Sequence, residues 1–268
     1  MVRATFLHSL LTAVALTVGF LACDTPDPLA TSSLVLTFDN RVGSRPLTLN
    51  DSTYRNAAGE SFTVSKFNYF VSNIRLRRDD GSEYVYPQDI SYFLVEASRP
   101  ASQTITLANV PKGNYTGLTL LLGVDSLRNL ADISRRTGVL DPGLNTHDAM
   151  YWEWNSGYIF VKLEGTSPLA PAAQNGGFLY HIGGFGGGVN GKKTINNLRT
   201  VSIPFGTDRV AVQPGATPVV RLTTDVAKVF DGPTKLSIAA HPGVMFEDYS
   251  KNIADNMAQM MRYGGLRN

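Results

Sequence analysis

The 268-residue sequence predicts an all-β fold: an antiparallel β-sandwich with a short inserted helix and a C-terminal helix. Two observations lead to this prediction. Short runs of aromatic and β-branched residues recur along the chain, with turn residues between them. Only two segments show the three- and four-residue apolar spacing of an amphipathic helix. Many short strands with little helix are typical of two packed antiparallel sheets.

The predicted strands share enrichment in Val, Ile, Thr, Tyr, Phe and Trp and are bounded by Gly, Pro, Asn, Asp or Ser. In chain order they cover residues 34–38, 62–64, 66–76, 84–86, 92–96, 104–107, 115–122, 150–154, 158–164, 178–182, 194–203, 219–222 and 236–239. Asp-Asp-Gly-Ser at 79–82 and Pro-Lys-Gly-Asn at 111–114 supply hairpin turns.

Two segments depart from the strand pattern. Residues 125–136 place Leu127, Leu130 and Ile133 three residues apart, which predicts a short helix after a turn at Asp125. Residues 247–263 carry apolar side chains at helical spacing and predict an amphipathic C-terminal helix. The apolar residues of that helix are Ile253, Met257, Met260 and Met261.

The N-terminus is typical of a secretory signal. Arg3 precedes an uncharged apolar run over 6–21, which ends at Ala22 and then at Cys23, the single cysteine of the chain. This pattern predicts a bacterial lipoprotein with signal peptide 1–22, followed by an acylated Cys23 and a polar tether over 23–32. An ordinary signal peptide with an incidental cysteine is the alternative. We expect one domain over 33–263 and a tail over 264–268, because no repeat or composition shift divides the chain.

Composition excludes several classes of function. The formal net charge is only +2 and there is no long basic run, so we expect no nucleic-acid partner. With Cys23 acylated, neither disulfides nor cysteine metal sites are available. There is no nucleophile-elbow serine, phosphate-binding loop or EF-hand spacing, and no acid/base pair stands out. We therefore predict that the protein is not an enzyme.

Three histidines remain after signal removal, and each lies beside turn residues. His147 precedes the tryptophan segment, His181 is followed by a glycine-rich stretch, and His241 precedes Pro242, with Met245 four residues on. Two or three imidazoles with a thioether would suit copper. The alternative for each histidine is an ordinary surface or hydrogen-bonded imidazole.

Both tryptophans lie two residues apart, at Trp152 and Trp154. In an extended strand such residues point to the same face, so we expect the two rings to lie side by side. They would form either an aromatic surface, able to stack on a sugar or to be oxidised, or part of the core. A glycan-binding platform of Trp152, Trp154 and Tyr158 is therefore an alternative function.

A series of segments resembles the MbnP-like proteins, which are periplasmic or surface copper-binding proteins named after a partner in methanobactin operons. The resemblance extends over 34–263, and the run Met-Tyr-Trp-Glu-Trp-Asn-Ser-Gly-Tyr at 150–158 is its most specific part. In chain order, the similar segments are 67–76, 123–126, 141–142, 150–158, 163–165, 180–183, 241–245 and 253–256.

This resemblance implies a β-sandwich that binds copper, with Cu(I) favoured. It implies His181 and His241 as primary ligands. Because Cu(I) is soft and accepts few ligands, we hypothesise His147 as a candidate third ligand and Met245 or an oxidised indole as a weak donor. The resemblance also implies a di-haem partner oxidase, of the cytochrome c peroxidase and MauG type, that converts Trp152 or Trp154 to kynurenine.

The resulting prediction is a copper-binding lipoprotein for acquisition, buffering or delivery of the metal. We expect it to be anchored to the outer membrane, in the periplasm or at the cell surface. The two alternatives are a glycan-recognition lipoprotein and a structural surface lipoprotein without a ligand.

Overall fold

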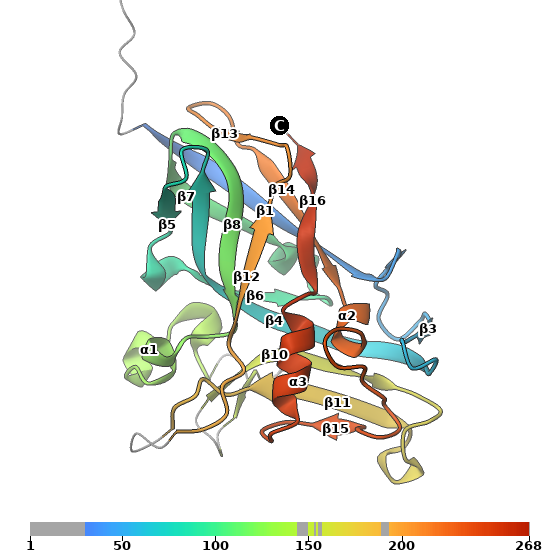
Figure 1. The fold of residues 1–268 in the computed structure, drawn as a ribbon. Helices are drawn as coiled ribbons and strands as arrows, with labels where there is room; N and C mark the ends of the chain where they lie inside the picture. Colours follow the sequence, from blue (N-terminus) through green and yellow to red (C-terminus); the bar gives the residue numbers. More distant parts are fainter. Residues whose placement is uncertain (1–29, 144–149, 153, 155–156, 189–192, 268) are drawn as a thin grey trace, which may run out of the picture.

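The computed structural model describes residues 30–143, 150–152, 154, 157–188 and 193–267. The chain is built mostly from strands, with short helices at its periphery (Figure 1). The strands are β1 (Thr31–Val42), β2 (Arg45–Pro46), β3 (Tyr54–Arg55), β4 (Ser61–Arg78), β5 (Glu83–Val85), β6 (Tyr92–Glu96), β7 (Thr104–Pro111), β8 (Gly113–Leu122), β9 (Tyr151–Trp152), β10 (Gly157–Thr166), β11 (Gly177–Gly183), β12 (Arg199–Pro204), β13 (Val210–Val212), β14 (Val219–Asp225), β15 (Gly243–Val244) and β16 (Met261–Arg267). The helices are α1 (Ser126–Asn129), α2 (Ala227–Phe230) and α3 (Ser250–Met257).

The strands form two sheets. The smaller sheet has the order β16-β14-β1-β2, with β7 also paired to β1, and the larger has the order β12-β8-β4-β10-β11-β15 with shorter strands attached. Most neighbours are antiparallel, but β1 pairs with β14 and β11 with β15 in parallel. Parallel neighbours need long crossover connections, and both pairs join strands that are distant in the sequence. The predicted all-β sandwich is confirmed, although it is not purely antiparallel.

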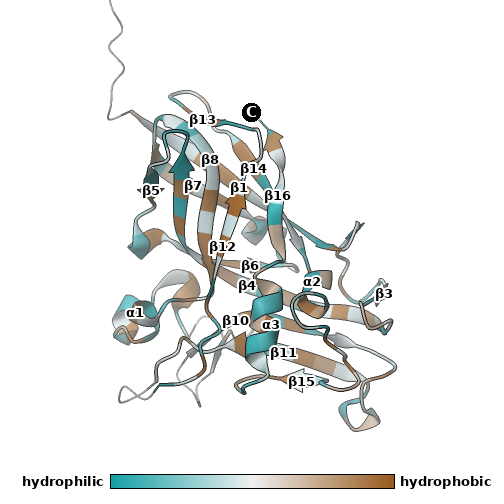
Figure 2. Cartoon of the chain, in the orientation of Figure 1, coloured by the Kyte–Doolittle hydropathy of each residue, from teal (hydrophilic) through white to brown (hydrophobic). Residues whose placement is uncertain are grey.

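Two apolar clusters lie on opposite faces of the larger sheet. The first, which we call the main core, fills the space between the two sheets and includes inward residues of β1 such as Leu34 and Leu36. Alternate residues of β1 are buried, which is the two-residue period of a strand with one face on the core. Figure 2 shows hydrophobic residues recurring along the strands of both sheets. The second cluster, which we call the outer cluster, includes Phe70, Trp152 and Phe160.

Some predicted strands differ from the observed ones. Two predicted strands over 62–76 form the single strand β4, and the strand predicted from 194 begins only at Arg199. The segment 236–239 is not a strand, although Leu236 and Ile238 are buried in the main core. Its amides at Ile238 and Ala239 donate to the carboxylate of Glu60 instead of to a neighbouring strand. The apolar alternation therefore predicted correctly that this segment is buried. It did not predict that the Glu60 side chain, rather than a neighbouring strand, would accept the backbone hydrogen bonds.

The predicted inserted helix is shorter than expected, and its apolar residues face solvent instead of the core. It consists of α1 and a separate 3₁₀ turn over Ile133–Arg135. Its apolar side chains are exposed by 73% at Leu127, 59% at Leu130 and 67% at Ile133, so they do not form a buried face. The polar Asn129 is buried instead, because its amide donates to the carbonyls of Val124 and Asp125.

The C-terminal helix is also shorter than predicted. α3 ends at Met257, and the chain then enters β16, which pairs with β14 from Met261 to Arg267. Residues 264–267, predicted as a tail, therefore belong to a sheet. β1 begins at Thr31, within the segment predicted as a tether. Within the residues that the structure covers, no helix has the length and apolar character to span a membrane. Cys23 lies outside the described residues.

Candidate functional site

The last pair of the parallel strands β11 and β15 is followed on each side by a residue with a soft donor side chain. Tyr180 pairs with Val244, and both side chains are buried in the main core. Successive residues of a strand point to opposite faces, so His181 points to the outer face of the larger sheet. The next residue of each segment after this pair is a soft donor: His181 in β11, and Met245 directly after the end of β15. The sequence placed these residues 64 positions apart.

A cavity of about 450 Å³ opens over this strand pair. Met245, exposed by 42%, and Trp154, exposed by 65%, are among its lining residues. The remaining lining residues are Gln174, Leu179, Gly243, Phe246 and Glu247. A ligand at Met245 would thus be accessible from solvent and bounded by an indole.

The two tryptophans lie side by side as predicted, but in different environments. Their ring centroids are 5.3 Å apart, and each ring also packs edge-on against Phe246. Trp152 is only 5% exposed and lies directly on Gly183, where an added Cβ would come 2.7 Å from the indole. Glycine is therefore required at this position for the indole to pack on β11. Trp152 belongs to the scaffold, and Trp154 is the ring available at the surface.

The imidazole of His181 is held from the neighbouring strand. Its Nε2 lies 2.7 Å from Oε1 of Glu164, and Nζ of the buried Lys162 lies 3.9 Å from the same oxygen. Lys162 is directly opposite His181 in the β10–β11 register. The hydrogen bond with His181 is the largest of the effects that hold the pKa of the Glu164 carboxyl below its ordinary value.

Polar residues continue from this pair across the same face of the sheet. Lys162 pairs with Asn68 on β4, and Asn68 pairs with Glu96 on β6. Asn68 is 1% exposed, and within the described ranges neither atom of its amide has a hydrogen-bond partner. Sequence reasoning missed Lys162 and Glu164. The available signal was the alternation within a predicted strand, in which the charged Lys162 and Glu164 follow the apolar Val161 and Leu163.

His241 lies elsewhere. Its carbonyl accepts a hydrogen bond from the hydroxyl of Tyr180, and its ring stacks on Tyr249 at 3.7 Å. Tyr180 points toward the main core, opposite to His181, and Tyr249 packs against the same core. The register also aligns His241 with the start of β11, four residues before His181, or roughly 13 Å along the strand. The structure does not bring these two histidines together.

Glu60 fixes the segment that leads to His241. Its carboxylate accepts hydrogen bonds from the amides of Ile238 and Ala239 and from the side chains of Asn56 and Ser237. Burial alone would raise the pKa of Glu60, but these four hydrogen bonds outweigh it and lower the pKa below 4.5.

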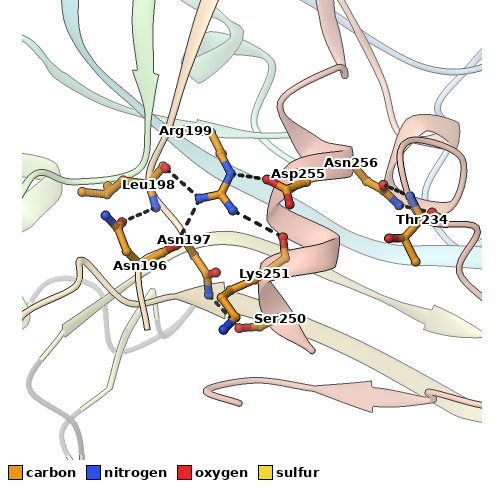
Figure 3. Close-up of polar contacts among 9 residues, drawn as sticks. All are labelled: Asn196, Asn197, Leu198, Arg199, Thr234, Ser250, Lys251, Asp255 and Asn256. Atoms are coloured by element: carbon orange, nitrogen blue, oxygen red, sulfur yellow. Dashed lines mark hydrogen bonds and ion pairs between the residues drawn. The ribbon is translucent and has the colours of Figure 1, made fainter. Parts of the chain in front are cut away.

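Helix α3 is tied to the chain that follows β11 (Figure 3). The amide of Asn197 donates to Oγ of Ser250 at 2.8 Å and also to the carbonyl of Gly183 at 2.7 Å. Arg199 pairs with Asp255 at 2.7 Å. These contacts connect the end of β11 with the start of α3, and the segment between β15 and α3 carries Met245. The segment that supplies Met245 and its neighbours to the cavity wall is thereby anchored where it enters α3.

Two of the three rings of the predicted glycan-binding platform are buried in the structure. Tyr158 is fully buried, and its hydroxyl donates to the carbonyl of Leu140. Trp152 is nearly buried as well. Neither ring can stack on a sugar, so the predicted platform of Trp152, Trp154 and Tyr158 is wrong. It failed because the close packing of β9 on β10 places Tyr158 inside the outer cluster.

His147 lies outside the described residues. Among the residues that are described, no three His, Cys, Asp or Glu side chains come close enough to hold a metal ion together. Imidazole and thioether are soft donors that suit Cu(I), which accepts few ligands. The described donor chemistry at His181 and Met245 therefore fits Cu(I) better than a hard cation.

Comparison with known proteins assigns the chain to a family. The family model described as MbnP matches residues 31–246. Among solved structures, the chain is similar to MbnP from Methylosinus trichosporium, with 16% sequence identity, 75% of this chain and 78% of that chain covered, and a TM-score of 0.52. At this identity the likeness shows a shared fold. No curated protein sequence matches the chain.

Proposed function

Because the chain belongs to the MbnP family, we propose that it is an extracytoplasmic, lipid-anchored protein that binds copper for acquisition, buffering or delivery. Membership of this family suggests a copper-related role associated with methanobactin. The observation that supports the proposal is the β11–β15 pairing: the residues that follow its last pair are His181 and Met245, and Met245 lines a solvent-open cavity bordered by Trp154. Copper is the cargo of this site.

In this proposal His181 is the primary ligand, Met245 the second and His147 a third. The thioether and imidazole favour Cu(I) over Cu(II) or zinc. His241 was expected to be a primary ligand, but its stacking on Tyr249 and its place beside the start of β11 favour a structural role. No catalytic activity of the protein's own is proposed.

Trp154 is the tryptophan that we propose for oxidation to kynurenine by a di-haem partner oxidase. Its indole is exposed and borders the cavity, whereas that of Trp152 is packed on Gly183. Intact-mass and peptide-mass measurements on protein from its native host test this assignment. An oxygen-derived mass change confined to the Trp154 peptide supports it, and an unmodified mass contradicts it.

Copper binding is tested by anaerobic titration of the purified protein with Cu(I) against a chromophoric chelator. We expect one equivalent to bind, and we expect the double variant His181→Ala/His241→Ala to bind none. Uptake that is unchanged in the double variant would refute the assignment of the site. Zinc and Cu(II) titrated in parallel test the preference for a soft cation.

Lipid anchoring through Cys23 is tested separately by fractionating cells that express the unaltered protein or Cys23→Ser. We expect the unaltered protein in the membrane fraction and the variant to be absent from it. Equal distribution of the two would contradict the lipid anchor and leave the copper site unaffected.

A further inference from the structure

A carboxylate from β10 holds the imidazole of His181. In the β10–β11 register Lys162 pairs with His181 and Glu164 with Leu179, so Glu164 is a diagonal neighbour of His181 on the same face. We propose that Glu164 is a positioning residue: it fixes His181 as the tautomer protonated at Nε2, so that Nδ1 is the atom that ligates copper. This inference rests on the proposed copper-binding function.

The contact itself is short and sheltered. Oε1 of Glu164 lies 2.7 Å from Nε2 of His181, and the His181 side chain is only 16% exposed. A carboxylate at neutral pH accepts hydrogen bonds but does not donate them, so Nε2 of the imidazole must carry the proton. In the part of the chain that the structure describes, Nδ1 has no hydrogen-bond partner. Its lone pair is therefore available to a metal.

The arrangement of the strands agrees with this assignment. β11 lies between β10, which carries Glu164, and β15, which leads to Met245. The hydrogen bond to β10 occupies one nitrogen of His181, while the strand that precedes Met245 pairs with the other edge of β11. A hydrogen bond from a ligating histidine to a carboxylate also fixes the ring orientation and raises the basicity of the ligand.

Glu164 is better suited to positioning than to ligation. Carboxylate oxygens are hard donors, whereas Cu(I) prefers thioether and imidazole. Lys162 adds a second reason, because its buried ammonium group lies 3.9 Å from the same carboxylate oxygen. Glu164 is thus engaged by two groups of the protein before any metal arrives.

The tautomer is measured in the copper-free protein by long-range proton–nitrogen NMR with ¹⁵N-labelled histidine, using His181→Gln to assign the signals. We expect His181 to show a protonated Nε2 and an unprotonated Nδ1 near pH 7.5. In Glu164→Leu we expect a mixture of the two tautomers, and in Glu164→Gln retention of the Nε2-protonated form. A protonated Nδ1 in the unaltered protein overturns the proposal, and this measurement holds even where Glu164→Leu fails to fold.

Copper loading supplies the second measurement. We expect Cu(I) to shift the Nδ1 signal of His181, and Glu164→Leu to bind Cu(I) about 10- to 100-fold more weakly. Glu164→Gln should lose much less affinity, and Glu83→Leu, which removes an exposed carboxylate on β5, should lose none. A shift at Nε2, or equal affinity in Glu164→Leu, overturns the proposal. Failure of the unaltered protein to bind copper refutes the proposed function, while the tautomer of the copper-free protein still tests Glu164.

Discussion

The two ends of the β11–β15 pair carry the same residue type in opposite circumstances. At one end His241 stacks on Tyr249, beside a loop that Glu60 anchors with three hydrogen bonds. At the other end Nε2 of His181 bonds to Glu164, and Nδ1 has no hydrogen-bond partner among the described residues; Leu179, two residues before His181, lines a cavity with a thioether and an indole. His181 and His241 both lie beside turn residues, so this feature does not distinguish them. Their surroundings in the folded protein decide which imidazole is a candidate ligand.

The contrast also applies to the tryptophans near His181. One indole completes the outer cluster and the other borders the cavity, although two residues separate them in the sequence. The difference distinguishes groups that build the scaffold from groups that are free to react. Each prediction below tests this distinction.

The largest effect is expected for the buried indole. Trp152→Ala should lower the free energy of unfolding by about 3–5 kcal/mol, because it opens a cavity over Gly183. Trp154→Ala should cost under about 1 kcal/mol, because its ring is mostly in solvent. Denaturant unfolding of both variants measures the difference. Equal losses would mean that Trp154 is also part of the scaffold.

The single histidine variants separate the two ends directly. His181→Ala should weaken Cu(I) binding by at least about 100-fold, or roughly 2.7 kcal/mol, because it removes the proposed primary ligand. His241→Ala should leave the affinity within about twofold. Competition titration with a Cu(I) chelator measures both constants. Equal weakening would show that the two imidazoles act on the same copper ion.

Protonation of Glu60 at low pH should reduce the stabilisation of the loop that leads to His241. The pKa of Glu60 in the folded protein is below 4.5, so its stabilising contribution is complete above that pH and is lost as pH falls through the folded pKa. Glu60→Gln should cost about 2 kcal/mol at neutral pH, as expected for losing hydrogen bonds to a charged group. The difference from the unaltered protein should shrink below pH 4.5. A gap that stays constant in urea unfolding down to pH 3 would contradict this account.

The smallest effect is expected at the thioether. Met245→Leu keeps the size and apolar character of the side chain but removes the sulfur, so the fold should be unaffected. We expect Cu(I) affinity to fall about tenfold, which corresponds to roughly 1.4 kcal/mol. Leu179→Met, at another lining position of the same cavity, is the control and should not weaken binding. If Met245→Leu kept its full Cu(I) affinity, the thioether would not be a ligand and only nitrogen donors would bind the metal.

Local patterns were sufficient for much of the fold. Two-residue alternation identified most strands, and the spacing of Trp152 and Trp154 predicted the contact of their rings. The same patterns did not predict how long the peripheral helices are or which of their faces is buried. The apolar spacing of Leu127, Leu130 and Ile133 predicted a buried face, but hydrogen bonds of Asn129 turned the other side inward.

The amino-acid sequence by itself determined the class of fold, the family resemblance and the set of residues able to bind a soft metal. Only the tertiary structure decided that His181 contacts Glu164 and lies in the strand that pairs with β15, while His241 stacks on Tyr249. The reason is that a strand's period of two residues fixes which side chains share a face. Which face meets which neighbour depends on the register between strands that are distant in the chain, and local sequence does not encode that register.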